Sequence, residues 1–209
     1  MTHRHGSEFE AIRRRLRSQL EAADDAVSAE VKPGQAAVAL VLRKNVGATD
    51  LLVIKRAIDP RDHWSGHLAL PGGRRASGDT ALSLTAVRET REEVGMDLAA
   101  GGHILGRLET VTPRSPLAPQ LIVTPYVAVA PPAYHILEPG DEGAALTLSP
   151  EVEAAFWVPV SLLRRNGPSE VFRLIGEDEE REWPAYATEH GLIWGMTVRI
   201  LTIFLRLIQ

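Results

Sequence analysis

Hydrophobic residues recur along the chain with two spacings, and each spacing predicts a different kind of secondary structure. Apolar positions three or four residues apart, or a nearly uniform apolar run, predict helices at 7–24, 80–94, 161–165 and 191–208. Shorter apolar runs predict strands at 36–42, 51–55, 103–111, 121–129 and 156–160. Strands of antiparallel appearance with helices beside them indicate one α+β domain or one layered α/β/α domain.

The segments between these elements differ in character. Residues 44–50 form a polar loop between the first two strands, whereas 57–79 is a long stretch rich in Gly, Pro, Asp and His. A stretch of that length without regular structure is usually functional, so we expect a site there. The closing apolar run contains Arg199 and Arg206 and is short for a membrane span, which favours a buried helix. We expect one face of it to pack on the sheet, with the N-terminal helix or a second subunit of a homodimer over the rest.

Composition and charge narrow the class of protein. The chain of 209 residues is long enough for one domain with a core, and 44% apolar with 24% charged residues is ordinary for a soluble protein. A net charge of −4 disfavours binding to nucleic acid or an anionic membrane. The absence of cysteine excludes disulfides, zinc–thiolate sites and thiol catalysis. The N-terminus lacks the apolar core of a signal peptide, so we expect a cytoplasmic protein.

The most informative chemistry lies on the helix expected at 80–94. Glu89, Glu92 and Glu93 fall at positions i, i+3 and i+4, which share one helix face. Crowded carboxylates repel one another unless a cation lies between them, and hard divalent cations such as Mg²⁺ prefer oxygen ligands. The opposite face is expected to anchor the helix in the core through Leu84, Val87 and Val94.

A plainer interpretation of the same residues is an exposed helix with Arg–Glu pairs, since most charge runs are only solvated faces. The glycine turn ahead of the helix changes that balance. Pro71, Gly72 and Gly73 let the backbone turn tightly and approach a ligand closely. A glycine turn at a fixed distance before a carboxylate helix favours a functional site.

This segment resembles the Nudix box, whose usual form is G-x5-E-x7-R-E-U-x-E-E-x-G-U, where U is a bulky aliphatic residue. The positions that match in register are Arg88, Glu89, Glu92, Glu93, Gly95 and Met96. Thr90 occupies the first U, Gly73 lies one residue further from the box arginine than usual, and Asp79 replaces the first Glu. The extra residue and the Asp resemble the coenzyme A pyrophosphatase branch of the family, which often reads PGGxxxxxD before its box helix.

Other segments resemble the same branch, which carries an upstream pattern close to LLTxRSxxxRxxxGxxxFPGG. The corresponding residues here lie within 52–73, with Ala57 in place of Ser, Leu70 in place of Phe, and one extra residue between Arg61 and Gly66. Further segments that resemble the branch stand at 123–127, 156–160 and 193–197. The resemblance therefore spans roughly 36–208.

The resemblance implies a Nudix-type α/β/α sandwich with a mixed sheet over 31–209, preceded by an N-terminal helical extension over 1–30. It implies a metal-dependent hydrolase that cleaves the pyrophosphate bond of a nucleoside diphosphate derivative, with coenzyme A or acyl-coenzyme A as the favoured substrate. One alternative is a Nudix pyrophosphatase for ADP-ribose, dinucleotides or nucleoside triphosphates. Another is a catalytically silent, nucleotide-binding Nudix regulator, which the intact glutamates disfavour.

The resemblance also implies roles for the box residues. Glu89, Glu92 and Glu93 are expected to be catalytic and to hold Mg²⁺ or Mn²⁺, with the carbonyl of Gly73 as an additional ligand. Arg88 is expected to pair with a box carboxylate rather than to touch substrate. The general base is Glu89 if it lies within the box, and the alternatives from a later loop are Glu151 and Glu153.

Several residues around the glycine turn are candidates for binding the substrate. Arginine suits phosphate groups because its fork binds them bidentately. The candidates are Arg56, Arg61, Arg74 and Arg75, for each of which an ordinary surface arginine is an equal alternative. Trp64 is a candidate for stacking on an adenine ring.

Overall fold

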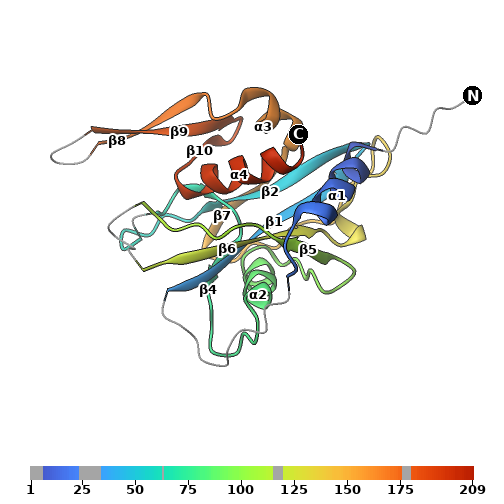
Figure 1. Cartoon of the computed structure of the whole chain (residues 1–209), viewed down its shortest axis with the longest axis horizontal. Coiled ribbons are helices and arrows are strands. Elements are labelled where there is room, and N and C mark those ends of the chain that lie inside the picture. The colour runs from blue at the N-terminus through green and yellow to red at the C-terminus, as the bar shows by residue number, and fades with distance from the viewer. Residues whose placement is uncertain (1–6, 24–33, 63, 115–119, 176–179) are drawn as a thin grey trace, which may run out of the picture.

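The computed structural model describes residues 7–23, 34–62, 64–114, 120–175 and 180–209, and its main feature is a mixed sheet between helices (Figure 1). The strands are β1 (Gln35–Asn45), β2 (Ala48–Arg56), β3 (Leu68–Ala69), β4 (Gly72–Arg74), β5 (His103–Arg107), β6 (Ile122–Val129) and β7 (Val152–Pro159). They follow the order β3-β2-β1-β6-β5, with β4 paired to β1 and β7 paired to β2. Only the β1–β6 pair among these is parallel, so the sheet is mixed, as predicted.

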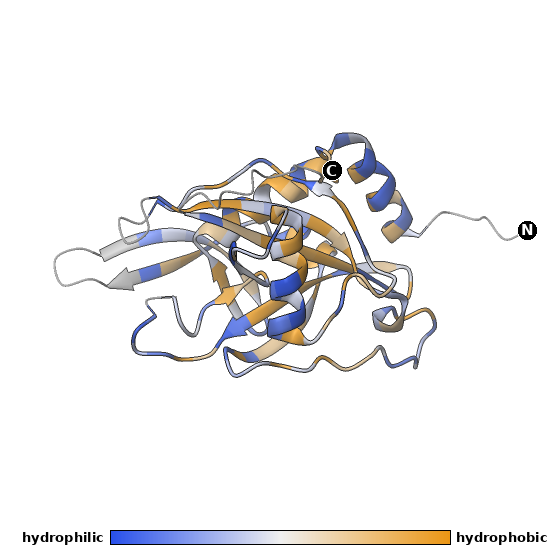
Figure 2. Cartoon of the chain, turned by 90° about the horizontal axis from the view of Figure 1, so that it is seen from below, coloured by the Kyte–Doolittle hydropathy of each residue, from blue (hydrophilic) through white to orange (hydrophobic). Residues whose placement is uncertain are grey.

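Helices cover both faces of this sheet. Figure 1 shows α2 (Leu82–Val94) on one side, and α4 (Met196–Leu207) on the other, with α1 (Glu8–Gln19) and α3 (Val160–Asn166) packed into the core beside α4. The alternation along β1 explains this arrangement, because Leu40 and Leu42 join one core and Ala39 and Val41 join the other. The strands are largely hydrophobic, whereas α1 shows a hydrophilic side together with its buried stripe (Figure 2). The predicted layered α/β/α architecture is therefore confirmed.

The first hairpin is tighter than the sequence indicates. Residues 44–50, predicted to be a polar loop, belong mostly to β1 and β2, which are joined by Val46 and Gly47 alone. Both residues have positive φ, +43° and +88°, and such a backbone matches the twist of a two-residue hairpin. The prediction failed because polar residues on an extended hairpin resemble a loop when only the sequence is considered.

Other boundaries also shift. The first helix ends at Gln19 rather than at residue 24, and the strand predicted at 103–111 ends at Arg107. The strand predicted at 156–160 begins at Val152, and Val160 already belongs to α3. A short 3₁₀ turn, η1 (Pro132–Tyr134), follows β6.

A second sheet was not predicted. It contains β8 (Glu170–Ile175), β9 (Glu180–Thr188) and β10 (Gly191–Trp194) in the order β10-β9-β8, all antiparallel. The closing helix predicted at 191–208 is therefore wrong in its first turn, since 191–194 is a strand. Gly195, with φ of +69°, separates the strand from α4, and Gly191, with φ of +124°, begins the strand after the turn from β9.

The N-terminal helix covers the end of α4. Arg15 donates a hydrogen bond from Nη1 to the carbonyl of Ile208 at 2.9 Å, and Gln19 donates from Nε2 to the carbonyl of Leu207 at 3.1 Å. Leu205 and Ile208 are buried within the chain itself. These two side chains need no second subunit to cover them, and a homodimer stays a prediction. No helix among the described residues has both the length and the apolar character needed to cross a membrane.

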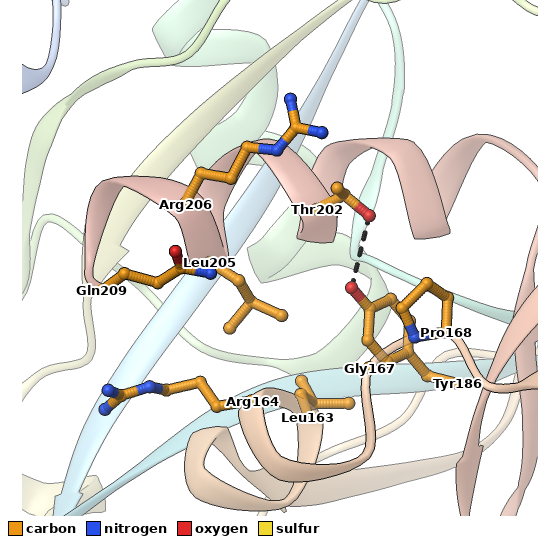
Figure 3. Close-up of a pocket in the computed structure, with 9 residues that line it drawn as sticks. All are labelled: Leu163, Arg164, Gly167, Pro168, Tyr186, Thr202, Leu205, Arg206 and Gln209. Carbon is orange, nitrogen blue, oxygen red and sulfur yellow. Dashed lines mark hydrogen bonds between the residues drawn. The ribbon is translucent and has the colours of Figure 1, made fainter.

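A hollow of about 320 Å³ lies between α3, β9 and α4, on the face of the sheet away from α2 (Figure 3). Its polar groups do not converge. The hydroxyl of Tyr186 is 3.2 Å from that of Thr202, and the guanidinium groups of Arg164 and Arg206 extend away from each other. Ligand sites need polar groups that converge on a common point. We therefore assign no ligand to this hollow.

Candidate active site

Helix α2 carries the three predicted glutamates, but they lie in different environments. Glu93 is only 4% exposed, whereas the Glu92 side chain is 52% exposed and that of Glu89 is intermediate at 17%. Leu84, expected to anchor the helix, is 46% exposed, so that prediction is wrong. Val94 is buried as predicted, and the other buried residues of the helix include Ser83, Ala86 and Thr90.

Glu93 is bound to the glycine turn. The N–H of Gly72 donates a hydrogen bond to Oε2 of Glu93 at 2.9 Å. Burial raises the pKa of Glu93 to about 7, the Gly72 N–H opposes this rise, and the negative charges of Glu89 and Glu151 add to it. The site therefore contains a buried carboxylate whose ionised form gains stability from any cation that comes close.

Glu89 is packed against the next glycine. A Cβ atom added at Gly73 would lie 2.4 Å from Oε1 of Glu89, so only glycine leaves room for the carboxylate in this position. Burial raises the pKa of Glu89, the charge and hydrogen bond of Arg88 lower it, and the charges of Glu92 and Glu151 raise it further. The adjoining glycines thus contact two carboxylates of α2.

Arg88 is the cation that organises this face of α2. Its guanidinium lies 2.9 Å from Oε1 of Glu89, 2.7 Å from Oε2 of Glu92 and 3.0 Å from Oδ2 of Asp79. It also donates to the carbonyl of Arg74 at 3.1 Å, which links the helix to β4. The pairing of Arg88 with box carboxylates agrees with the sequence-based expectation.

Asp79 closes the loop before the helix. Burial alone would raise its pKa, but hydrogen bonds from Arg88, from the Ala76 N–H and from the Thr85 hydroxyl outweigh burial and lower it. The ionised carboxylate therefore acts as a stable partner that holds Arg88 in place. This role explains why an acidic residue stands at this position.

Residues 32–175 match the sequence profile of the NUDIX domain, which covers more than half of the chain. The chain belongs to the Nudix family. The "Uncharacterized Nudix hydrolase NudL" of Salmonella paratyphi B is 34% identical over 151 residues, which are 72% of this chain and 71% of that protein. The "Uncharacterized protein C14C4.10c" of Schizosaccharomyces pombe is 35% identical over 116 residues, 53% of this chain but 32% of that protein. The chain thus spans about a third of the S. pombe relative.

A solved structure shares the fold. The MutT/nudix family protein from Enterococcus faecalis is 20% identical and superposes with a TM-score of 0.52 over 88% of this chain and 65% of that one. The Nudix fold is therefore confirmed. As a Nudix hydrolase, the protein is a pyrophosphohydrolase, and enzymes of this family generally use divalent metal ions.

The side chains of the Nudix helix fit a divalent metal by chemistry, although they do not yet converge. Among the described residues, no three carboxylate or imidazole groups surround a single point. Glu89 and Glu92 are turned toward Arg88, and Glu93 toward Gly72. The mutual repulsion of Glu89 and Glu93 leaves negative charge that a hard cation with oxygen ligands would neutralise. The oxygen donors of these three side chains are therefore of the kind that Mg²⁺ or Mn²⁺ prefers.

The two alternative bases differ in their surroundings. Glu151 is exposed and close enough for its charge to raise the pKa of both Glu89 and Glu93. The irregular segment before it is bonded to α2, since the Ser149 N–H donates to the Glu93 carbonyl at 3.0 Å. Glu153 is paired with Lys55 at 2.6 Å.

The arginine candidates for substrate binding also differ in their exposure and partners. Arg75 is 7% exposed, and its guanidinium donates to the Asp79 carbonyl at 3.0 and 3.1 Å and to Gln35 at 3.0 Å. It therefore stabilises the loop, and we no longer count it among the substrate-binding candidates. Arg74 is exposed on β4, next to the glycine pair.

The remaining candidates lie at the end of β2 and on the loop after it. Arg56 is bound to Asp62 at 2.7 Å, and Arg61 is 90% exposed and paired with Asp59 at 2.9 Å. The Trp64 residue is 39% exposed, and its backbone N–H donates to Oδ1 of Asp62 at 3.0 Å. Asp62 was missed by the sequence analysis, because an aspartate in an irregular loop gives no periodic signal.

Gly73 offers a test of this geometry. The substitution Gly73→Ala should reduce kcat/KM by about 10²-fold, because displacing a site group by about 1 Å has effects of that order and a Cβ here would displace the Glu89 carboxylate. Gly78→Ala is the matched control, since it lies in the same loop with no atom within 4 Å and neither glycine has a positive φ. Steady-state kinetics of both variants measure this effect. Equal activity of Gly73→Ala and Gly78→Ala would show that the position of the Glu89 carboxylate is not required.

Proposed function

We propose that this Nudix hydrolase splits the pyrophosphate of coenzyme A or an acyl-coenzyme A, with Mg²⁺ or Mn²⁺ held by Glu89, Glu92, Glu93 and the carbonyl of Gly73. The observation that carries the metal assignment is the contact of two carboxylates of α2 with adjoining glycines of one turn. The bound ion supplies charge neutralisation at the phosphates and a more acidic water. Arg88 pairs with both Glu89 and Glu92 and neutralises part of their charge.

We assign the general base to Glu151. Glu89 forms an ion pair with Arg88, and Glu153 forms one with Lys55. Among the described residues, no cation is paired with Glu151. Its charge acts on both Glu89 and Glu93, so it lies beside the proposed metal ligands. A base needs to reach a water next to the reacting phosphorus, and an exposed carboxylate at this position meets that requirement.

The coenzyme A assignment is supported by the resemblance of residues 52–73 to the branch pattern and by exposed groups near the turn. Arg74 and Arg61 have exposed side chains, and arginine binds phosphate bidentately. They are our candidates for the 3′-phosphate. Trp64 offers a ring on which adenine can stack. The products would be phosphopantetheine and adenosine 3′,5′-bisphosphate.

A comparison of coenzyme A with dephospho-coenzyme A tests this assignment. The kcat/KM for coenzyme A should be about tenfold or more higher, because a charged hydrogen bond to the 3′-phosphate is worth roughly 1.5–3 kcal/mol. Arg74→Gln should reduce this preference, whereas Arg14→Gln on α1 should leave it unchanged. Products are identified by mass after reaction with Mg²⁺ or Mn²⁺.

The same panel includes the alternative substrates. Equal rates on the two compounds, or a preference for ADP-ribose, a dinucleotide or a nucleoside triphosphate, would overturn the coenzyme A proposal. Binding without turnover of any compound would favour the silent regulator. Either result leaves the membership in the Nudix family unchanged.

A further inference from the structure

We infer that the second sheet positions the loop between β2 and β3 through an aromatic cluster of Phe172, Trp194 and His67. In this role the three rings are positioning residues that set affinity for the part of the substrate away from the pyrophosphate. The loop consists of the described residues 57–62 and 64–67, and is named here the β2–β3 loop. The part of this inference that concerns substrate affinity rests on the proposed function, because it requires a nucleotide in the neighbouring site.

The cluster joins three elements that are distant in sequence. The rings of Phe172 on β8 and Trp194 on β10 are stacked, with centroids 3.9 Å apart and planes 8° apart. His67, just before β3, meets both rings edge-on, at 4.7 Å from Trp194 and 5.9 Å from Phe172. Edge-to-face and stacked arrangements are the favourable geometries for aromatic pairs. The cluster is therefore a specific contact rather than loose packing.

The strand between the two stacked rings makes room for them. Ala185 on β9 pairs with Trp194 and is fully buried. Cross-strand partners share a face of the sheet, so a side chain of one carbon lies next to Trp194, whereas the partner of Phe172 on β9 is Trp183. The next strand continues the contact, since a Cβ added at Gly191 of β10 would lie 3.8 Å from Leu68 of β3. The second sheet thus meets the end of the β2–β3 loop along a continuous seam.

The loop itself is closed where the cluster touches it. The Arg56 N–H donates to the His67 carbonyl at 3.1 Å, and the Gly66 N–H donates to the Arg56 carbonyl at 3.1 Å. Asp62 then binds the Arg56 guanidinium inside the loop. Holding His67 therefore holds both ends of the loop.

Both ends of the loop lie at the proposed active site. At its start, the Ala57 N–H donates to the Glu151 carbonyl at 2.8 Å. After β3, the chain reaches Gly72, whose N–H binds Glu93. Between these points the loop exposes Ile58 at 77% and Trp64 at 39%, large apolar groups that a nucleotide or its attached group would cover.

The family comparison adds an independent reason to look here. The NUDIX match ends at residue 175, so β9, β10 and α4 lie outside it. Figure 1 shows the β8–β9 hairpin projecting at the same end of the molecule as the β2–β3 loop. A segment outside the shared domain that contacts the loop beside the site is well placed to set substrate preference.

Hydrogen exchange tests whether the aromatic cluster positions the β2–β3 loop, and this measurement does not require enzymatic activity. In Trp194→Ala, peptides that cover the β2–β3 loop should exchange about fivefold to tenfold faster, the effect expected from the loss of an aromatic pair. Trp194→Phe should keep most of the protection. The matched control is His190→Ala, because His190 is stacked on Phe156 of β7 at 3.7 Å and makes no ring contact or hydrogen bond with the described residues of the loop. Unchanged exchange in Trp194→Ala would overturn the inference whatever the activity.

Steady-state kinetics test whether the aromatic cluster sets the affinity for the substrate. For the substrate that the parent enzyme cleaves best, Trp194→Ala should raise KM about tenfold and change kcat by less than about twofold, with His190→Ala unchanged in both. If Trp194→Ala does not fold, Trp194→Phe and Phe172→Leu take its place, with Phe172→Leu giving the larger effect. Faster exchange with an unchanged KM would overturn the inference that the cluster sets the affinity for the substrate. A parent enzyme that cleaves nothing would instead count against the proposed function, and the exchange result would still decide the role of the cluster.

Discussion

Replacing Glu93 with glutamine should lower kcat by about 10²-fold or more, because a metal-bound carboxylate contributes several kcal/mol to the stabilised transition state. Glutamine keeps an oxygen that accepts the hydrogen bond of the Gly72 N–H, but it removes the charge that would bind the ion. EDTA should abolish the activity of the parent enzyme for the same reason. Steady-state rates with Mg²⁺ and Mn²⁺ at saturating substrate measure both effects.

Two controls separate lost chemistry from lost folding. Glu153→Gln removes a carboxylate that is paired with Lys55, and should change kcat by less than about twofold. Burial raises the pKa of Glu93 to about 7, so at pH 8 without metal the ionised carboxylate destabilises the parent, a cost that the neutral variant avoids. Glu93→Gln should therefore melt no lower than the parent under these conditions. Full activity of Glu93→Gln would remove this residue from the site.

The environment of α2 shows what the sequence can and cannot predict. The helix and its carboxylates follow from spacing alone, but the choice of buried face does not. Hydrophobicity points to Leu84, whereas the buried stripe includes Ser83, Ala86 and Thr90. Small residues let the helix approach the sheet closely, and the hydroxyl of Thr90 is satisfied by the Ala86 carbonyl at 2.7 Å. A polar side chain bonded within its own helix is buried at little cost, which a hydrophobicity pattern does not register.

The candidate site shows the same limit. The glycine turn and box were predictable because glycine and carboxylates stand at fixed spacing. Arg75 was not, because its partners Gln35 and Asp79 come together only in the folded sheet. The second sheet was also missed, although Phe172 on β8 and Trp194 on β10 are ordinary strand residues, since short strands resemble buried helix segments in sequence.

The largest expected effect on stability comes from α4. Phe204 is fully buried in the core shared by α1, the main sheet and α4. Phe204→Ala should therefore cost about 3–5 kcal/mol through lost burial and the cavity left behind, which is a large fraction of a typical unfolding free energy of about 5–15 kcal/mol. For a chain of this length the melting temperature should fall by about 10 °C or more. Thermal unfolding without metal measures it.

Arg206→Ala on the same helix is the control for that change, since Arg206 is exposed and its loss should cost less than about 1 kcal/mol. Deleting 192–209 extends the argument, because it removes β10 and α4 together and uncovers the apolar face of the main sheet. Such a surface promotes aggregation, so the truncated chain should be insoluble. A truncated chain that stays soluble, monomeric and fully active would show that α4 is peripheral. If the truncated chain is insoluble but Phe204→Ala lowers the melting temperature only slightly, the stabilising contact would instead be assigned to β10 and its ring cluster.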